Sequence, residues 1–355
     1  MLIQSPDWLV TMPKVELHVH LEGSMSPETL LDLSQRNNVD LGISARDDAM
    51  ALYRYHDCQG FIRTFTTCST CIVTPDDLRT LVLAHGREMS RQNIRYAEIH
   101  GNFEPHRRWQ GMSMADPLHA LNAARDELFA EAEIEVCWIA DGIRDADSEP
   151  ISATHTVEMM ASTGPETSIV ALGLGGDEIT GPATDFVDAF KLAREAGFHV
   201  VAQAGEVVGA KSIYDAITLL GAERIGHGIR ILEDPDVVTL ARNLDISLEI
   251  SITSNVMTGV VADDTIHYLP EIAASGLAFS INTDDPPMFH TDLDREYAIS
   301  MHVLGLDRQG VAWLVASGID QSFASPSTRE RLHRELSAHT PLDQAIGDAA
   351  SINAT

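Results

Sequence analysis

The feature that most constrains the fold of this 355-residue chain is a regular succession of short strand-like segments, each followed by a helical pattern. The segments are rich in β-branched and other apolar residues, as buried parallel strands are. They fall within residues 13–24 and at 94–100, 134–139, 168–172, 199–202, 224–227, 246–250 and 277–281. Eight strands alternating with helices predict an α/β fold, a closed (β/α)8 TIM barrel. An open doubly wound sheet is the weaker alternative, because no glycine-rich dinucleotide loop follows the first segment.

Two stretches contain more helix than one helix after each strand would require. Residues 45–93 carry helical spacing with a second helix start at Thr74-Pro75, and residues 292–337 supply the last helices. We therefore predict one domain over residues 1–355, with extra helices after the first strand and at the C-terminus. Residues 339–355 are poor in large apolar side chains, which predicts a frayed tail.

The charge of the chain limits its partners. There are 53 acidic residues against 24 basic ones, a formal net charge of −29. This balance disfavours nucleic acid and anionic membranes and favours a small-molecule substrate. Neither a signal-peptide core nor an apolar run of membrane-spanning length is present, so we expect a cytoplasmic protein. The sequence leaves the oligomeric state open.

The four cysteines do not suggest a disulfide framework in a chain of this length. Cys68 and Cys71 have CxxC spacing, but no second pair completes a zinc site. We interpret them as thiols of the core or of a helix face.

Ionisable residues gather at the C-terminal ends of the candidate strands. They are His18 and His20 at the end of the first strand, Glu206 after the fifth, His227 at the end of the sixth, and Asp284 and Asp285 after the eighth. In a barrel these strand ends face one another on a single rim. Two imidazoles and a carboxylate, from His18, His20 and Asp284, suit a catalytic zinc ion that acidifies water. Glu206 and His227 would then be available to move or orient protons.

Each of these residues also has a structural interpretation. A single histidine at a strand end, such as His227, is more often a hydrogen-bonded structural residue than a catalyst. The run Asp284-Asp285-Pro286-Pro287 could mark a turn and the entry to a helix. Their joint occurrence on one rim favours the functional interpretation.

Several longer motifs strengthen it. They are PKVELHVHLEGS at 13–24, LGGDE at 174–178, QAGE at 203–206, RIGHG at 224–228, TSN at 253–255 and INTDDPPMF at 281–289. In this order, over nearly the whole chain, they resemble the adenosine and adenine deaminases of the amidohydrolase superfamily.

The resemblance implies zinc-dependent hydrolytic deamination at C6 of a 6-aminopurine, with one zinc ion per chain. It implies zinc ligands at His18, His20 and Asp284. It also implies roles around the purine ring for Glu206 (proton donor to N1), His227 (positioning of water), Asp285 (hydrogen bond to N7), Gly176 (backbone beside N3) and Glu22 (sugar side).

Three positions depart from the family pattern. Gln203 stands where the family has a third histidine ligand, and its amide is a weak or lost ligand for zinc. His199, four residues earlier, lies roughly 13 Å away along a strand and cannot substitute. His100 replaces a common arginine, and Ser251-Ile252 replaces a common Cys-Pro.

These departures leave three hypotheses open. The first is deamination of adenosine or a related 6-aminopurine. The second is the same barrel acting on a different modified purine or a pterin in specialised metabolism, which a product screen would reveal. The third is a metal-depleted, non-catalytic purine-binding relative, which metal analysis would reveal.

Overall fold

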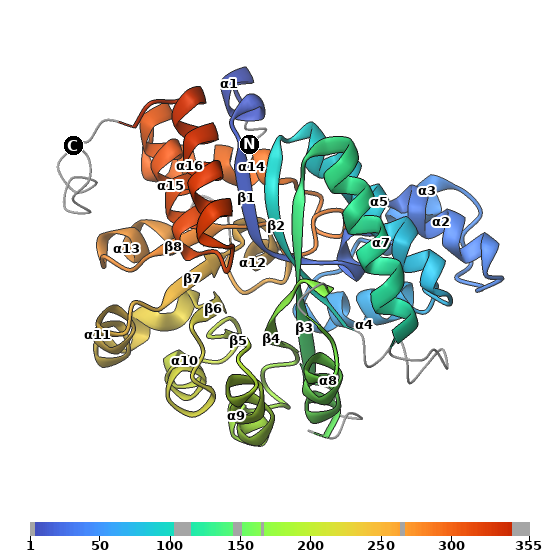
Figure 1. Cartoon of the computed structure of the whole chain (residues 1–355), viewed down its shortest axis with the longest axis horizontal. Coiled ribbons are helices and arrows are strands. Elements are labelled where there is room, and N and C mark those ends of the chain that lie inside the picture. The colour runs from blue at the N-terminus through green and yellow to red at the C-terminus, as the bar shows by residue number, and fades with distance from the viewer. Residues whose placement is uncertain (1–3, 103–114, 145–150, 165–166, 263–266, 343–355) are drawn as a thin grey trace.

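The fold is an eight-stranded parallel barrel, as the sequence predicts. The computed structural model describes residues 4–102, 115–144, 151–164, 167–262 and 267–342. Its strands follow one another in chain order around the sheet, with the helices outside them (Figure 1). They are β1 (Lys14–His20), β2 (Ile94–Gly101), β3 (Glu135–Arg144), β4 (Ile169–Gly176), β5 (His199–Ala204), β6 (Arg224–His227), β7 (Ser247–Ile250) and β8 (Phe279–Ile281).

The ring of strands closes between β8 and β1. Val19 and Asp284 form a parallel bridge. The backbone N–H of His20 donates to the carbonyl of Asp284 at 2.8 Å, and the N–H of Asp284 donates to the carbonyl of His18 at 3.0 Å. The hydrogen bonds that close the barrel therefore also hold two candidate zinc ligands beside the third.

Extra helices follow β1, as expected. They are α2 (Pro27–Arg36), α3 (Arg46–Leu52), α4 (Cys58–Ser69) and α5 (Pro75–Arg91), after the short η1 (Glu22–Ser24). Thr74 and Asp77 form a capping box at the start of α5, and Ser26 caps α2 through the N–H of Thr29. A short α1 (Asp7–Thr11), which the sequence pattern did not indicate, precedes β1.

The remaining helices lie between and after the later strands. They are α7 (Ala115–Ala132), α8 (Ile151–Ala161), η3 (Ala183–Phe186), α9 (Val187–Glu195), α10 (Ala210–Asp215), the π-helical η4 (Ala216–Leu220), η5 (Ile229–Glu233), α11 (Pro235–Asn243), α12 (Ile252–Met257), α13 (Leu269–Ala274), α14 (Leu293–Leu304), α15 (Arg308–Gln321) and α16 (Pro326–His339). The predicted frayed tail begins where α16 ends, and residues 343–355 lie outside the described residues.

Strands β3 and β4 extend beyond the predicted ends at residues 139 and 172. Their pairing continues in register as far as Arg144 opposite Gly176. Gly173, Gly175 and Gly176 weaken the local strand signal, but the ladder with β3 supplies the hydrogen bonds that hold the extended backbone. The extension carries side chains of β3, including Asp141, to the rim.

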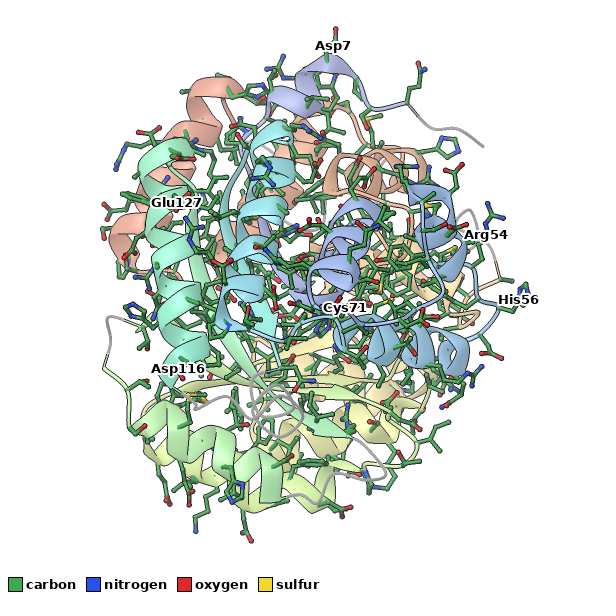
Figure 2. All side chains as sticks on the ribbon, turned by 90° about the vertical axis from the view of Figure 1, so that its right-hand side faces the viewer. Asp7, Arg54, His56, Cys71, Asp116 and Glu127 are labelled. Atoms are coloured by element: carbon green, nitrogen blue, oxygen red, sulfur yellow. The ribbon has the colours of Figure 1, made fainter. Side chains whose placement is uncertain are left out.

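One outer face is formed by long helices. In the side view, α5 and α7 run next to each other (Figure 2). An ion pair joins Arg79 of α5 to Glu127 of α7. All four cysteines are unpaired, and three of them are buried, in keeping with their interpretation as core thiols.

None of the helices in the described part of the chain combines the length and apolar character of a membrane span.

A buried ion network crosses the barrel interior. The guanidinium of Arg224 contacts the carboxylates of Glu98 and Glu249, with 2.7 Å between Arg224 Nε and Glu249 Oε1. All three side chains are 2% exposed or less. Glu98 also accepts a hydrogen bond from the backbone N–H of Phe323, which stacks on Arg224. The network joins strands β2, β6 and β7, which carry Glu98, Arg224 and Glu249.

Arg224→Met is expected to lower the free energy of unfolding by about 3–5 kcal/mol, because two buried carboxylates lose their counter-charge. Urea denaturation measures this change. The matched control is Arg79→Met, which breaks a partly exposed ion pair and should cost about 1 kcal/mol or less. Equal losses in the two variants would show that the Arg224 network contributes no more than a surface pair.

Candidate active site

The side chains of His18, His20 and Asp284 converge at the C-terminal rim of the barrel. Asp284 Oδ1 lies 3.5 Å from His18 Nε2 and 3.3 Å from His20 Nε2. One ligand atom from each of the three residues lies within 4.8 Å of the others. Such spacing allows a single ion to contact all three.

Carboxylates face the opposite nitrogens of both imidazoles. His18 Nδ1 hydrogen-bonds to Glu249 Oε2 at 2.6 Å, and His20 Nδ1 lies 3.6 Å from Asp141 Oδ2. Each carboxylate is placed to accept a hydrogen bond from Nδ1–H of its ring, which would leave Nε2 of both rings available to a metal ion. This arrangement is typical of metal-binding histidines, whose second nitrogen is held by an acceptor.

Gln203 completes the ring of side chains around this point. Its Nε2 lies 2.8 Å from His20 Nε2 and 3.2 Å from His18 Nε2, within hydrogen-bond distance of both rings. Rotation of the amide would present its oxygen instead. Two imidazoles and a carboxylate fit a zinc ion, and Gln203 lies where its carbonyl oxygen can be a further, weaker ligand.

Asp141 is a site residue that the sequence analysis missed. Besides facing His20, it accepts a hydrogen bond from His100 Nδ1 at 2.8 Å. A Cβ atom at Gly173, on the neighbouring strand, would lie 1.9 Å from Asp141 Oδ1, so only glycine leaves room for this carboxylate. The departure at His100 is therefore part of a cluster with Asp141 behind His20.

Asp141→Asn is expected to weaken zinc binding about tenfold, because the carboxylate that faces His20 loses its charge. Competition with a chelator of known affinity measures the dissociation constant. Asp188→Asn, at an exposed position of α9, controls for the change in net charge. Zinc affinity equal to that of wild type would show that Asp141 does not support His20.

Two site residues adopt strained backbone conformations. The φ angles of His227 and Asp284 are 60° and 67°, in the left-handed region that non-glycine residues rarely enter. Such positions cost about 1–3 kcal/mol and persist where surrounding contacts hold them. Asp284 is held by its barrel-closing hydrogen bonds and by Ser254, whose hydroxyl donates to Asp284 Oδ2 at 2.6 Å. These backbone conformations direct the side chains of both residues towards the candidate metal site.

Glu206 and His227 lie next to each other beside this centre. His227 Nε2 is 3.6 Å from Glu206 Oε2 and 3.9 Å from Asp284 Oδ2. Burial raises the pKa of Glu206, and nearby Asp284 adds to the rise, whereas His227 opposes it. A carboxyl group with a raised pKa keeps its proton closer to neutral pH, which suits a proton donor.

Asp285 is a second carboxyl group of the site with a raised pKa. Burial raises its pKa well above the usual value, and repulsion from Asp284 raises it further. The carboxyl packs tightly over Gly23, where a Cβ atom would lie 1.5 Å from Asp285 Oδ1. A protonated Asp285 can donate a hydrogen bond to an acceptor in the site.

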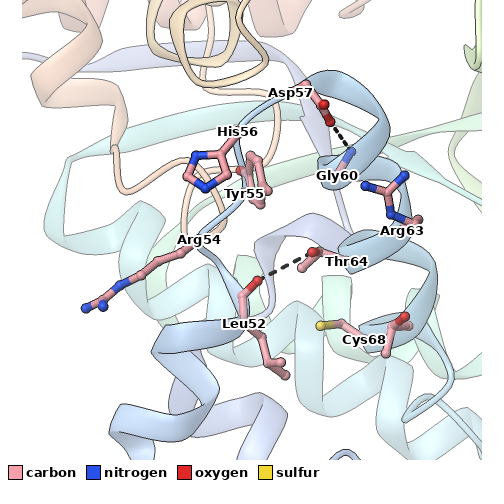
Figure 3. Close-up of a pocket in the computed structure, with 10 residues that line it drawn as sticks. Leu52, Arg54, Tyr55, His56, Asp57, Gly60, Arg63, Thr64 and Cys68 are labelled. Atoms are coloured by element: carbon pink, nitrogen blue, oxygen red, sulfur yellow. Dashed lines mark hydrogen bonds between the residues drawn. The ribbon is translucent and has the colours of Figure 1, made fainter.

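A cavity of about 480 Å3 joins these groups. Its lining includes Glu22, Phe61, Phe65, Gly176, Glu206 and Asp285. Helix α4 forms one wall with its inner face, while its outer face borders a separate shallow groove (Figure 3). Asp57 caps α4 by accepting from the N–H of Gly60 at 2.6 Å, and Thr64 donates to the carbonyl of Leu52. These bonds fix the helix that narrows the cavity.

The other candidate residues take clear positions. Glu22 is buried at the cavity and accepts from the N–H of Asn102 at 3.1 Å, and Gly176 lies at the end of β4 with φ of 95°. His199 is exposed at the start of β5 and pairs with Glu223, far along the strand from Gln203. Ser251 is buried and immediately precedes α12. Neither His199 nor Ser251 belongs to the cavity lining.

Comparisons with known proteins identify the family of the chain. The sequence profile of the family described as adenosine deaminase matches residues 13–339. An aminodeoxyfutalosine deaminase of Streptomyces avermitilis is 36% identical over 337 residues, covering 94% of this chain and 92% of the relative. An adenine deaminase of Sinorhizobium fredii is 31% identical over 326 residues, covering 90% and 97%.

Among solved structures, an adenine deaminase of Arthrobacter aurescens superposes with a TM-score of 0.86 at 28% identity, covering 92% of this chain and 98% of that one. The profile spans nearly the whole barrel, and the relatives align over nearly their full lengths. The chain therefore belongs to the adenosine deaminase family and is an aminohydrolase.

Proposed function

We propose that this enzyme hydrolytically deaminates adenosine or a related 6-aminopurine, giving the 6-oxo product and ammonia, with one zinc ion per chain. The observation that carries the proposal is the placement of two carboxyl groups beside the convergent ligands in one cavity. They are the partly buried Glu206 and the buried Asp285, and both have raised pKa values. Purine N1 and N7 are both hydrogen-bond acceptors, so a site for this ring needs donors on two sides.

The metal would be held by His18, His20 and Asp284, with Gln203 as a weak further ligand. When bound, zinc acidifies water and so supplies a nucleophile near neutral pH. His227 orients the attacking water from beside Asp284. The water is added at C6 of the purine.

Glu206 delivers its proton to N1 as water adds to C6, and the proton that the water loses passes to the carboxylate of Asp284. Asp285 donates to N7, and the backbone of Gly176 contacts the ring beside N3. Glu22 lies on the sugar side. The C6–N bond then breaks as the amino group takes the proton from Asp284 and leaves as ammonia. The hydroxyl proton on C6 returns to Glu206, and C6 keeps the oxygen of water as a carbonyl. Proton donation at N1 stabilises the charge that the attack creates.

A larger substrate is the second candidate. The cavity of about 480 Å3 extends from the rim to the aromatic face of α4 at Phe61 and Phe65, so it has room beyond a bare purine ring. The relative from Streptomyces avermitilis is named for aminodeoxyfutalosine. A different modified purine or a pterin also remains compatible with the changed residues His100 and Gln203, and a metal-depleted purine-binding protein is the non-catalytic alternative.

The test is an assay of the native protein against adenosine, adenine, aminodeoxyfutalosine, N6-modified adenosines and aminopterins. Ammonia release and mass spectrometry of the products give the reaction and the preferred substrate. Conversion of an amino to an oxo group on a 6-aminopurine supports the proposal. Zinc-loaded protein that turns over none of the 6-aminopurines would contradict it, and purine binding without metal or turnover would support the non-catalytic alternative.

A further inference from the structure

Behind His227, a chain of three buried hydrogen bonds leads away from the cavity. The backbone N–H of Leu269 lies 3.1 Å from His267 Nδ1. His267 Nε2 lies 3.1 Å from Asn255 Oδ1, and Asn255 Nδ2 lies 3.0 Å from His227 Nδ1. Asn255, His267 and His227 are each 2% exposed or less.

The direction of the first bond is fixed by the backbone. Leu269 is the first residue of α13, and its N–H is one of the groups that a helix leaves without an internal partner. A backbone N–H can only donate, so His267 Nδ1 must accept. A neutral His267 then carries its hydrogen on Nε2. Burial lowers the pKa of His267 to about 4, which agrees with a neutral ring.

The second bond follows from the first. Because His267 Nε2 donates, it needs an acceptor, and Asn255 must present its carbonyl oxygen to it. The amide nitrogen of Asn255 consequently points to His227. An amide nitrogen also only donates, so His227 Nδ1 is an acceptor and the hydrogen of a neutral His227 lies on Nε2.

A separate observation on the cavity side agrees with this assignment. His227 Nε2 faces two carboxylates, Glu206 Oε2 at 3.6 Å and Asp284 Oδ2 at 3.9 Å. A hydrogen on Nε2 points towards oxygen atoms of two carboxyl groups, each of which can accept it.

We propose that His267 and Asn255 are positioning residues that fix the tautomer of His227, so that His227 presents an N–H group to the reacting centre. In this form His227 donates a hydrogen bond to the attacking oxygen and does not accept its proton. The catalytic part of this inference rests on the proposed deaminase function. The assignment of the tautomer does not, since it follows from the hydrogen bonds alone.

Nitrogen NMR of the full-length, zinc-loaded protein labelled with 15N-histidine tests the assignment directly. Protonated and unprotonated imidazole nitrogens differ in chemical shift, and a His227→Gln spectrum identifies the signals of His227. We expect an unprotonated Nδ1 and a protonated Nε2. A hydrogen on Nδ1 and a lone pair on Nε2 would overturn the proposal.

Asn255→Asp tests the chain with an isosteric change. A carboxylate accepts from both neighbours, so it should move the hydrogen of His227 to Nδ1 and lower kcat about 100-fold, with little change in KM. Zinc content is measured in parallel, and kcat is compared at equal zinc occupancy. A wild-type kcat together with the shifted tautomer would show that the tautomer does not matter for catalysis.

His267→Phe and His267→Gln form a second, matched pair. Phenylalanine fills the space but cannot donate to Asn255, so kcat should fall about tenfold or more. Glutamine retains an N–H donor and should recover most of the loss. His85→Phe, in an unrelated buried position on α5, controls for the loss of a core imidazole. If the folded His267→Phe variant had the same kcat as wild type, or the same kcat as His267→Gln, the proposed role of His267 would be overturned.

Failure of this proposal is distinguishable from failure of the proposed function. If wild-type protein deaminates none of the 6-aminopurines, the function is wrong, but the NMR spectrum still decides the tautomer. If wild-type protein is active and His227 carries its hydrogen on Nδ1, the positioning chain is wrong and the function stands.

Discussion

Glu206→Gln is expected to lower kcat for the deaminated purine by about 10^2- to 10^4-fold, the range typical of a lost general acid or base. The amide keeps the size of Glu206 but cannot deliver a proton to N1. Zinc content should stay at the wild-type level, because Glu206 is outside the group of convergent metal ligands. Steady-state kinetics together with elemental analysis measure both quantities.

Glu233→Gln is the matched control, at an exposed position of η5 where Glu233 pairs with Arg230. We expect its kinetic constants to equal those of wild type. If Glu206→Gln retained full kcat with zinc bound, the proton donor would have to be another residue. The mechanism proposed for Glu206 would then be wrong.

The second large effect is expected from Gln203→His, which should raise zinc affinity about tenfold or more. An imidazole is a better zinc ligand than a neutral amide, and the position already lies 2.8 Å and 3.2 Å from the Nε2 atoms of His20 and His18. The dissociation constant comes from chelator competition. At limiting zinc, the specific activity on adenosine should rise in parallel with occupancy.

Gln59→His provides the control, because Gln59 lines the same cavity from α4 but lies outside the convergent ligand group. It adds the same imidazole without completing the ring around His18, His20 and Asp284. A Gln203→His protein with unchanged zinc affinity and unchanged rate would indicate that Gln203 belongs to a site adapted to a different substrate, and is not the limiting ligand.

Much of the barrel could be predicted because its information is local and repeated. Each strand is a short apolar run followed by a helical segment, and barrel closure places all C-terminal strand ends on one rim. His18, His20, Glu206, His227 and Asp284 could therefore be grouped before any contact was known, and the structure brings them together.

The supporting residues could not be found in this way, because their roles depend on contacts between strands. Asp141 lies beyond the predicted end of β3, and its place depends on the missing side chain at Gly173 of β4. Glu249 sits in a predicted strand, but only the packed barrel shows that it faces His18. His267 belongs to no sequence motif. Its ring is oriented towards Asn255 by a hydrogen bond from the N–H of Leu269, the first residue of α13, and only the structure shows this.

The central claim is that one zinc ion at His18, His20 and Asp284 enables the deamination of a 6-aminopurine. The most direct measurement strips the metal with a chelator, returns zinc in steps, and records ammonia release together with bound zinc per chain. We predict no ammonia release from the stripped protein and a rate that rises in proportion to bound zinc until one ion per chain is reached. Full activity in the stripped protein, or no ammonia at one zinc per chain, would contradict the claim.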